Sequence, residues 1–244
     1  MQHRITQKPG QYCVEQQRDY ESLERFQGIR SHAVAGVHEM IATALRDRLS
    51  PGARVLDLAC GAGALVLRLQ QAGYEVTACD LIPDKLCARD GVSFVQADLN
   101  EDFAFKFRGK FDGIVASEII EHLENPRHFL REVHKLLKPG APLVISTPNI
   151  DSPLSKAIFV RTGQHRWFSR SDYEESGHIT PLAEVCLRRA LVETGFEVER
   201  VSSCGSVPSS GWWKMRWLAW LLSIIATGET EEILVVEARR APAS

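Results

Sequence analysis

Short apolar runs alternate along the chain with segments in which apolar residues recur three and four positions apart. The short runs are bounded by glycine, proline or polar residues, which is typical of strands. They lie at residues 53–58, 74–80, 92–96, 111–117 and 142–147. Residues 63–71 and the stretch that begins at Asn125 and Pro126 have helical spacing instead. Strands separated by helices predict parallel βαβ units, so the fold class expected is α/β with a doubly wound, mostly parallel sheet.

The two ends of the chain carry different patterns. Residues 20–49 show apolar positions at helical spacing up to a Ser-Pro-Gly stop, and they predict an N-terminal helix. After a helix predicted over residues 181–194, the runs 196–202 and 232–239 predict an antiparallel pair at one edge of the sheet. We expect a single domain over 1–244. Its parts are an N-terminal helical segment (1–50), a ligand-binding core (50–150) and two insertions (151–180 and 205–231).

Composition places the chain among globular proteins with a sizeable core. Hydrophobic residues make up 44% of its 244 residues and charged residues 25%. The six cysteines form no Cys-x-x-Cys pair and the first ten residues contain no apolar signal segment, which favours reduced thiols in a cytoplasmic protein. A net charge of −2 gives no overall attraction to nucleic acid, so a nucleic-acid partner is disfavoured.

The distribution of charge is more informative than its sum. Residues 152–171 contain four basic residues and no carboxylate, and residues 205–228 contain two basic residues and again no carboxylate. The rest of the chain then holds 23 basic and 31 acidic residues, a balance of −8. An anionic partner is therefore expected to meet these two segments.

A small-residue turn, "CGAG", follows the first predicted strand of the core. Gly61 and Gly63 let the backbone approach a ligand at the carboxyl end of that strand, where doubly wound sheets bind ligands. A dinucleotide motif needs a third glycine where the chain has Val66, and Asp57 before the turn would repel a pyrophosphate but attract an ammonium group. Asp80 ends the second strand, where its carboxylate can accept both hydroxyls of a ribose, and Asp98 follows the third. These residues predict a nucleoside ligand with a zwitterionic tail and no phosphate; the alternative is a tight turn with a structural role.

The stretches "VLDLACGAG", "ACD", "ADL" and "SEIIEHLENP" followed by "STPN" and "GHITP" resemble class I S-adenosylmethionine-dependent methyltransferases. More narrowly, they are similar to the ubiquinone-biosynthesis O-methyltransferases and their relatives in polysaccharide biosynthesis. The resemblance implies a Rossmann-like methyltransferase fold with a seven-stranded sheet whose last strand is antiparallel. It also implies a cofactor, S-adenosylmethionine, and a site residue for each part of it. Asp57, Gly61 and Gly63 would hold its methionine end, Asp80 its ribose and Asp98 with Leu99 its adenine, while Ser117 and Glu118 would lie beside the methyl group. Leu81, next to Asp80, is a further cofactor-binding candidate.

Four residues are candidates for the chemistry. Glu118, Glu121 and His122 stand at i, i+3 and i+4, so one helical turn would bring them together, and His178 follows 56 residues after His122. Two carboxylates and two imidazoles suit a divalent metal ion such as Mg²⁺, Mn²⁺ or Zn²⁺, which would lower the pKa of an acceptor hydroxyl. Alternatively, His122 or His178 is a direct general base, or the four side chains are structural.

The insertions predict two further features. Residues 152–176 are expected to form a short helix and a lid over the acceptor site, or else a solvated loop. Residues 211–228 hold four tryptophans in an acid-free, apolar segment, of which Trp212 to Ala226 as a helix would reach only ~22 Å of the ~30 Å hydrocarbon core. Such a segment fits an anionic membrane surface, or alternatively a buried helix or a dimer contact.

The function expected is S-adenosylmethionine-dependent O-methylation of a hydroxyl. The acceptor would be a small amphiphilic or anionic molecule, of the prenylated phenol or lipid-linked saccharide type. The alternatives are an RNA 2′-O-methyltransferase and a catalytically silent module that binds the cofactor or a membrane. The location expected is cytoplasmic, with a peripheral position on the inner face of a membrane as a further expectation, and no oligomeric state is assigned.

Overall fold

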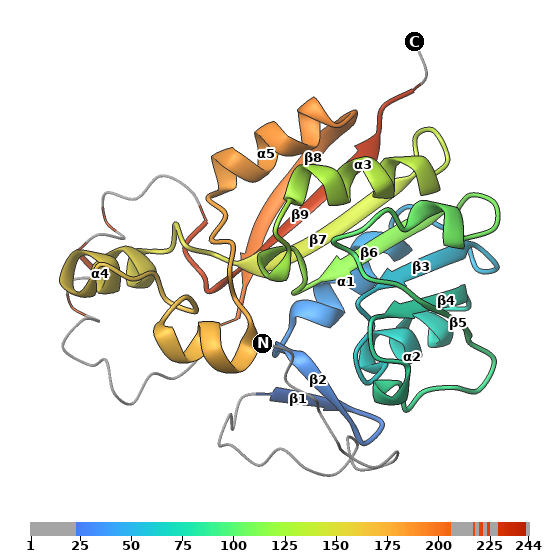
Figure 1. Ribbon diagram of the computed structural model, residues 1–244, viewed down its shortest axis with the longest axis horizontal. Helices are drawn as coiled ribbons and strands as arrows, with labels where there is room; N and C mark the ends of the chain where they lie inside the picture. Colours follow the sequence, from blue (N-terminus) through green and yellow to red (C-terminus); the bar gives the residue numbers. More distant parts are fainter. Residues whose placement is uncertain (1–22, 206–216, 218–219, 222–223, 225–228, 243–244) are drawn as a thin grey trace.

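A seven-stranded sheet in the order β5-β4-β3-β6-β7-β9-β8 runs through the molecule. The computed structural model describes residues 23–205 and 229–242, together with Trp217, Trp220, Leu221 and Ile224 (Figure 1). The strands of the sheet are β3 (Arg54–Leu58), β4 (Glu75–Asp80), β5 (Ser93–Gln96), β6 (Gly113–Ser117), β7 (Pro142–Pro148), β8 (Phe196–Cys204) and β9 (Ile233–Arg240).

The first five strands of the core are parallel, and the last strand is not. β3, β4, β5, β6 and β7 pair in parallel with their neighbours, whereas β9 is antiparallel to both β7 and β8. The α/β class, the mostly parallel sheet and the antiparallel last strand are thus confirmed. The parallel arrangement brings the carboxyl ends of β3, β4, β5, β6 and β7 to one edge of the sheet.

Helices cover both faces of the sheet. They are α1 (Val37–Arg46), α2 (Ala64–Gln71), α3 (Pro126–Leu136), α4 (Pro153–Thr162) and α5 (Glu184–Glu193). Alternate residues of β3 point to opposite faces: Leu56 packs in the cluster that contains α3 and α5, and Val55 in the one that contains α1 and α2. Figure 1 shows these two helical layers, with α4 beyond the carboxyl end of β7. Four short turns complete the described elements: η2 (Pro83–Lys85), η3 (Ala104–Lys106), η4 (Ile120–His122) and the π-helical η5 (Asp172–Ser176).

The N-terminal segment differs from its prediction. Where one helix was expected over 20–49, the structure has a two-stranded hairpin, β1 (Leu23–Phe26) and β2 (Ile29–Val34), before α1. Gln27 and Gly28 form the two-residue turn with φ values of 48° and 82°, a left-handed pair that ends helical spacing and starts a hairpin. The guanidinium of Arg68 on α2 lies 4.0 Å from the ring centroid of Phe26, so the hairpin packs against α2.

Smaller differences concern the helix after the first insertion and the thiols. The helix expected from Pro181 begins only at Glu184, because Thr180 is held in an extended segment by a 2.6 Å bond from its hydroxyl to the carbonyl of Leu123. Cys60, Cys79, Cys186 and Cys204 are free thiols as expected, whereas Cys87 is disulfide-bonded.

The second insertion falls mostly outside the described residues. Of the stretch 211–228, the structure describes Trp217, Trp220, Leu221 and Ile224, all of them helical and exposed. Among the residues described, no helix has the length and apolar character needed to cross a membrane.

Candidate functional site

Asp80 is fixed at the carboxyl end of β4 by the glycine turn that follows β3. The backbone N–H of Gly61 donates to its Oδ2 atom at 3.0 Å, and the N–H of Ile82 donates to Oδ1 at 3.0 Å. Each oxygen keeps lone-pair capacity for a further donor. The carboxylate is therefore oriented at the edge of the sheet and still able to accept two hydroxyl groups.

Asp57 lies near Asp80, on the neighbouring strand β3. Its side chain is buried, and among the residues that the structure describes no group forms a hydrogen bond with its Oδ2 atom. Burial raises its pKa well above the ordinary value, and the charge of Asp80 raises it further. A buried, unpartnered carboxyl oxygen is costly, and a cationic group placed against it would remove that cost.

Gly63 is required by close packing as well as by its backbone. Its φ is 93°, and a Cβ atom there would lie 2.8 Å from both the Ala88 Cβ and the Leu86 Cδ1 atoms. At Gly61, with φ 52°, a Cβ would instead meet the Cδ2 atom of His32 at 3.6 Å. His32 on β2 therefore lies over the glycine turn, and burial together with the nearby Lys85 lowers its pKa. Because the hairpin was not anticipated, this histidine was missed in the sequence.

The remaining cofactor candidates lie at the same edge of the sheet. Ser117 ends β6 and its hydroxyl is 3.0 Å from that of Ser146 on β7. Asp98 follows β5 and accepts from the N–H of Asn100 at 2.9 Å, while Leu99 next to it is buried. Leu81, directly after β4, is 55% exposed and thus available to a ligand.

Glu121, His122 and His178 form one cluster. A carboxylate oxygen of Glu121 and one ring nitrogen from each histidine all lie within 4.8 Å of one another. The segment that carries His178 reaches the η4 turn because the N–H groups of Ile179 and Thr180 both donate to the Glu121 carbonyl, at 3.0 and 2.9 Å. The two imidazole rings meet edge to face, with centroids 4.8 Å apart.

Backbone carbonyls determine the tautomers of the two histidines. His122 Nδ1 is 3.1 Å from the Gly177 carbonyl oxygen, and His178 Nδ1 is 2.6 Å from that of Trp167. A carbonyl oxygen only accepts, so each Nδ1 carries the proton and each Nε2 keeps its lone pair. Burial lowers the pKa of both rings, that of His122 to about 4, so both are neutral at neutral pH.

The two glutamates occupy different positions. Glu121 is fully buried, and its Oε2 atom accepts from the Thr147 hydroxyl at 2.9 Å. Its Oε1 atom lies 4.0 Å from His122 Nε2 and has no hydrogen bond to any residue in the described part of the chain. Glu118 lies outside the cluster of three. Burial raises the pKa of Glu118 above its ordinary value, and burial together with the charge of Glu118 raises the pKa of Glu121 well above its own.

The helical turn expected to join Glu118, Glu121 and His122 does not form. Glu118 has a φ of 50°, and the single 3-10 turn η4 starts only at Ile120. A left-handed residue interrupts helical geometry, so Glu118 leaves the face that carries Glu121 and His122. Glu118 is held there by its N–H, which contacts the Ser146 hydroxyl at 3.1 Å. A left-handed conformation of a residue other than glycine is strained and concentrates at functional sites.

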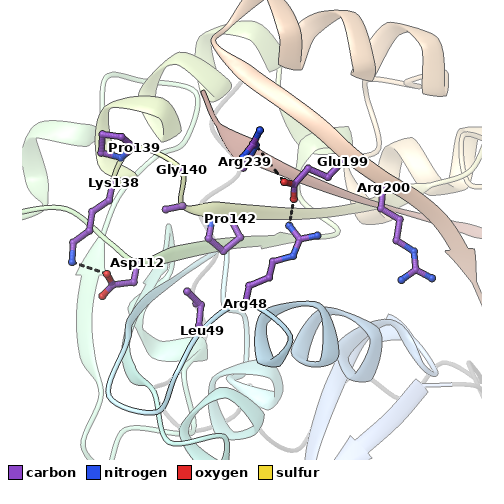
Figure 2. Close-up of a pocket in the computed structure, with 11 residues that line it drawn as sticks. Arg48, Leu49, Asp112, Lys138, Pro139, Gly140, Pro142, Glu199, Arg200 and Arg239 are labelled. Atoms are coloured by element: carbon purple, nitrogen blue, oxygen red, sulfur yellow. Dashed lines mark hydrogen bonds and ion pairs between the residues drawn. The ribbon is translucent and has the colours of Figure 1, made fainter. Parts of the chain in front are cut away.

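A large cavity lies elsewhere. It is an open cleft of about 720 Å³ at the amino ends of β6 and β7 (Figure 2). Two ion pairs lie in its lining: Lys138 is 2.6 Å from Asp112, and Arg239 is 3.3 Å from Glu199. Because ligands of doubly wound sheets bind at the carboxyl ends of strands, this cavity is not the candidate site.

The sheet order, the glycine turn after β3 and the carboxylates at the ends of β3 and β4 define the class I fold of S-adenosylmethionine-dependent methyltransferases. Comparisons with known proteins agree. The sequence profile of a family described as "Methyltransferase domain" matches residues 26–201. The chain belongs to this family.

Relatives and solved structures support the same assignment. A ubiquinone biosynthesis O-methyltransferase of Xanthomonas axonopodis pv. citri is 41% identical over 165 residues, covering 64% of this chain and 67% of that protein. Its namesake in Xanthomonas oryzae pv. oryzae is 41% identical over 105 residues, which are 40% of this chain, and the chain spans only 44% of that relative's length. The crystal structure of an S-adenosylmethionine-dependent methyltransferase from Mesorhizobium loti shares the fold at a TM-score of 0.59 and 23% identity, covering 84% of this chain and 99% of the other.

Proposed function

We propose that the protein transfers a methyl group from S-adenosylmethionine to a hydroxyl group of a small acceptor. The observation that carries this proposal is the cluster of Glu121, His122 and His178, which lies at the same edge of the sheet as the nucleoside-type site of Asp57 and Asp80. Bound S-adenosylmethionine would supply a methyl group attached to a sulfonium sulfur. After transfer the sulfur is a neutral thioether, so the leaving group needs no proton from an acid.

The residues of the glycine turn fit this cosubstrate. Asp57 has the unpartnered, buried oxygen that a methionine ammonium would satisfy. Asp80 presents an oriented carboxylate to the two ribose hydroxyls. We assign the adenine to Asp98, Leu99 and Leu81, and the neighbourhood of the methyl group to Ser117 and Glu118.

We propose that the cluster of three holds a divalent cation, Mg²⁺, Mn²⁺ or Zn²⁺. Both Nε2 atoms carry lone pairs, and both Nδ1 protons are held by carbonyl oxygens, the arrangement by which proteins orient histidine ligands. Glu121 Oε1 adds a buried oxygen without a hydrogen bond. Glu118 would lie beyond these three ligands and serve the acceptor. When bound, such an ion would lower the pKa of the acceptor hydroxyl.

Chelation tests the metal against direct base catalysis. We expect a chelator to stop methyl transfer without displacing S-adenosylhomocysteine, and added Mg²⁺, Mn²⁺ or Zn²⁺ to restore it. His122→Ala and Glu121→Ala should each weaken binding of Mn²⁺ in calorimetry, while the exposed Glu174→Ala should not. Full activity of a protein shown to be metal-free by elemental analysis would refute the metal and leave a histidine as general base.

We propose an amphiphilic or anionic acceptor, such as a prenylated phenol or a lipid-linked saccharide. The supporting observations are the two acid-free basic segments and the exposed apolar residues of α4, Phe159 and Val160. Such an acceptor would place the protein at the surface of an anionic membrane, where Trp217, Trp220 and Ile224 present apolar side chains. Transfer of a labelled methyl group, assayed in parallel with phenolic, saccharide and RNA acceptors, tests this choice. Labelled RNA alone would favour 2′-O-methylation, and no labelled product from any acceptor would favour a silent binding module.

A further inference from the structure

The first insertion is tied to the start of β9 by a buried ion pair. Arg166 Nε lies 2.5 Å from Glu232 Oε2, and the side chains of the two residues are only 11% and 10% exposed. The same oxygen faces the indole N–H of Trp167 at 3.3 Å. The guanidinium of Arg166 lies over the Trp167 ring, 5.1 Å from its centroid. One carboxylate thus holds two consecutive residues of the insertion.

Trp167 has a backbone conformation that needs such support. Its φ is 70°, in the left-handed region that a bulky side chain adopts only under constraint. In this conformation its carbonyl oxygen lies 2.6 Å from His178 Nδ1. The neighbouring Phe168 ring lies 5.6 Å from the His178 ring, so two consecutive residues of the insertion bound this imidazole.

We propose that Glu232 is a positioning residue for His178. By binding Arg166 and Trp167, it keeps Trp167 left-handed and its carbonyl directed at His178 Nδ1, which leaves the Nε2 lone pair facing His122 and Glu121. The role of His178 as a ligand rests on the proposed function, whereas the contacts that orient its ring do not. Glu232 lies more than 50 residues from His178 in sequence and acts on the ring through Arg166 and Trp167.

The backbone of Glu232 extends the same connection to the second insertion. Its N–H donates to the Gly205 carbonyl at 3.2 Å, and its own carbonyl accepts from the N–H of Asn149 at 2.8 Å. Gly205 and Glu232 flank the stretch that contains the exposed Trp217 and Trp220. Both insertions therefore meet at Glu232, and the orientation of His178 depends on a residue at the base of the tryptophan-rich segment.

The tautomer of His178 can be observed directly. We would label the full chain with ¹⁵N in its imidazoles, remove metal with a chelator, and record long-range ¹H–¹⁵N spectra at pH 8, where both rings are neutral. In the unsubstituted protein we expect His178 as the Nδ1-protonated tautomer only. In Glu232→Ala we expect a mixture of tautomers. His122 should remain Nδ1-protonated, because the Gly177 carbonyl and not Trp167 binds its ring.

Two further variants keep the test decisive. Glu232→Ala leaves Arg166 buried without its counter-charge. Trp167→Phe provides a milder change with the same expected direction, because it removes the indole N–H donor and part of the ring but keeps the Arg166–Glu232 ion pair. Glu174→Gln breaks the exposed Arg170–Glu174 pair of the same insertion and should change neither ring. Calorimetry should show about tenfold weaker Mn²⁺ binding in Glu232→Ala and unchanged binding of S-adenosylhomocysteine.

The outcomes separate this inference from the proposed function. An unchanged His178 tautomer in folded Glu232→Ala and Trp167→Phe would overturn the positioning role. A tautomer mixture without any loss of Mn²⁺ affinity would confirm the positioning role and contradict the metal site instead.

Discussion

Replacing Asp80 tests the cofactor site most directly, because this carboxylate has both a structural role and an expected role in binding the ribose. It accepts from the N–H groups of Gly61 and Ile82, and it is expected to accept from the two ribose hydroxyls. Asp80→Ala removes both sets of bonds. Asp80→Asn removes the charge but keeps one acceptor oxygen, which can hold the glycine turn through Gly61 or the loop through Ile82.

The expected loss of cofactor affinity follows from the number and kind of hydrogen bonds removed. Loss of charge-assisted bonds to the ribose costs about 1.5–3 kcal/mol. At 1.4 kcal/mol for each factor of ten, Asp80→Ala should bind S-adenosylhomocysteine roughly ten to a hundred times more weakly. Asp80→Asn should lie near the lower end of that range, about tenfold weaker, because half of its acceptors remain.

Isothermal titration calorimetry with S-adenosylhomocysteine measures these affinities without any need to know the acceptor. Asp84→Ala is the matched control, since this carboxylate lies four residues further along the same loop, is 57% exposed and makes only a 3.9 Å ion pair. We expect Asp84→Ala to bind like the unsubstituted protein. If Asp80→Ala also binds normally while remaining folded, the ribose assignment is wrong and Asp80 only shapes the turn.

Three further predictions follow from other parts of the structure. In urea titrations, Gly63→Ala should lower the free energy of unfolding by about 1–3 kcal/mol more than Gly140→Ala. Both glycines have a positive φ, but of the two only Gly63 lies where a Cβ atom would collide with Ala88. Equal losses of unfolding free energy would argue against the packing role. Burial lowers the pKa of His38 to about 4, so the fold favours its neutral form, and stability that is complete above about pH 6.5 is lost as the pH falls towards 4. When the pH falls from 7.5 to 5, the free energy of unfolding of the unsubstituted protein should thus decrease by about 2 kcal/mol more than that of His38→Gln. Equal decreases in the two proteins would exclude protonation of His38 as the cause. Joint replacement of Trp217 and Trp220 by Ser should reduce co-sedimentation with vesicles that contain anionic lipid, whereas replacing the exposed Phe105 by Ser should not; equal sedimentation of all three forms would count against a membrane role for the tryptophans.

Much of the fold was predictable because the signals in the core are local. The strand β3 and the helix α2 were recognisable from apolar spacing and from the glycines that separate them. The hairpin of β1 and β2 was not, because Phe26 and Ile29 fit helical spacing as well as a two-residue turn. Only the left-handed pair Gln27 and Gly28 distinguishes the two, and a single glycine inside a helical pattern is a weak signal.

The candidate site was predictable as a set of residues but not as a geometry. Spacing brought Glu121 and His122 together, His178 was a candidate as a second imidazole for the same site, and all three meet in the structure. Spacing also placed Glu118 with them, and the left-handed backbone at that position separates it. Nothing local in the sequence couples Glu232 to Trp167, since they are 65 residues apart and meet only through the packing of an insertion on the last strand.

The position of β9 has a consequence for the order in which the chain assembles. β9 is the last strand in sequence, yet it lies between β7 and β8 and pairs with both along seven or more residues. During synthesis, β8 therefore leaves the ribosome before the strand that joins it to the sheet exists, and the edge of β7 stays unpaired until residues 233–240 follow. An unpaired edge of this length invites pairing with other chains, so the stretch between β8 and β9 sets how long a nascent chain is exposed to aggregation. Glu232, the residue before β9, arrives at the same moment, so the sheet is completed and His178 is oriented in one late step.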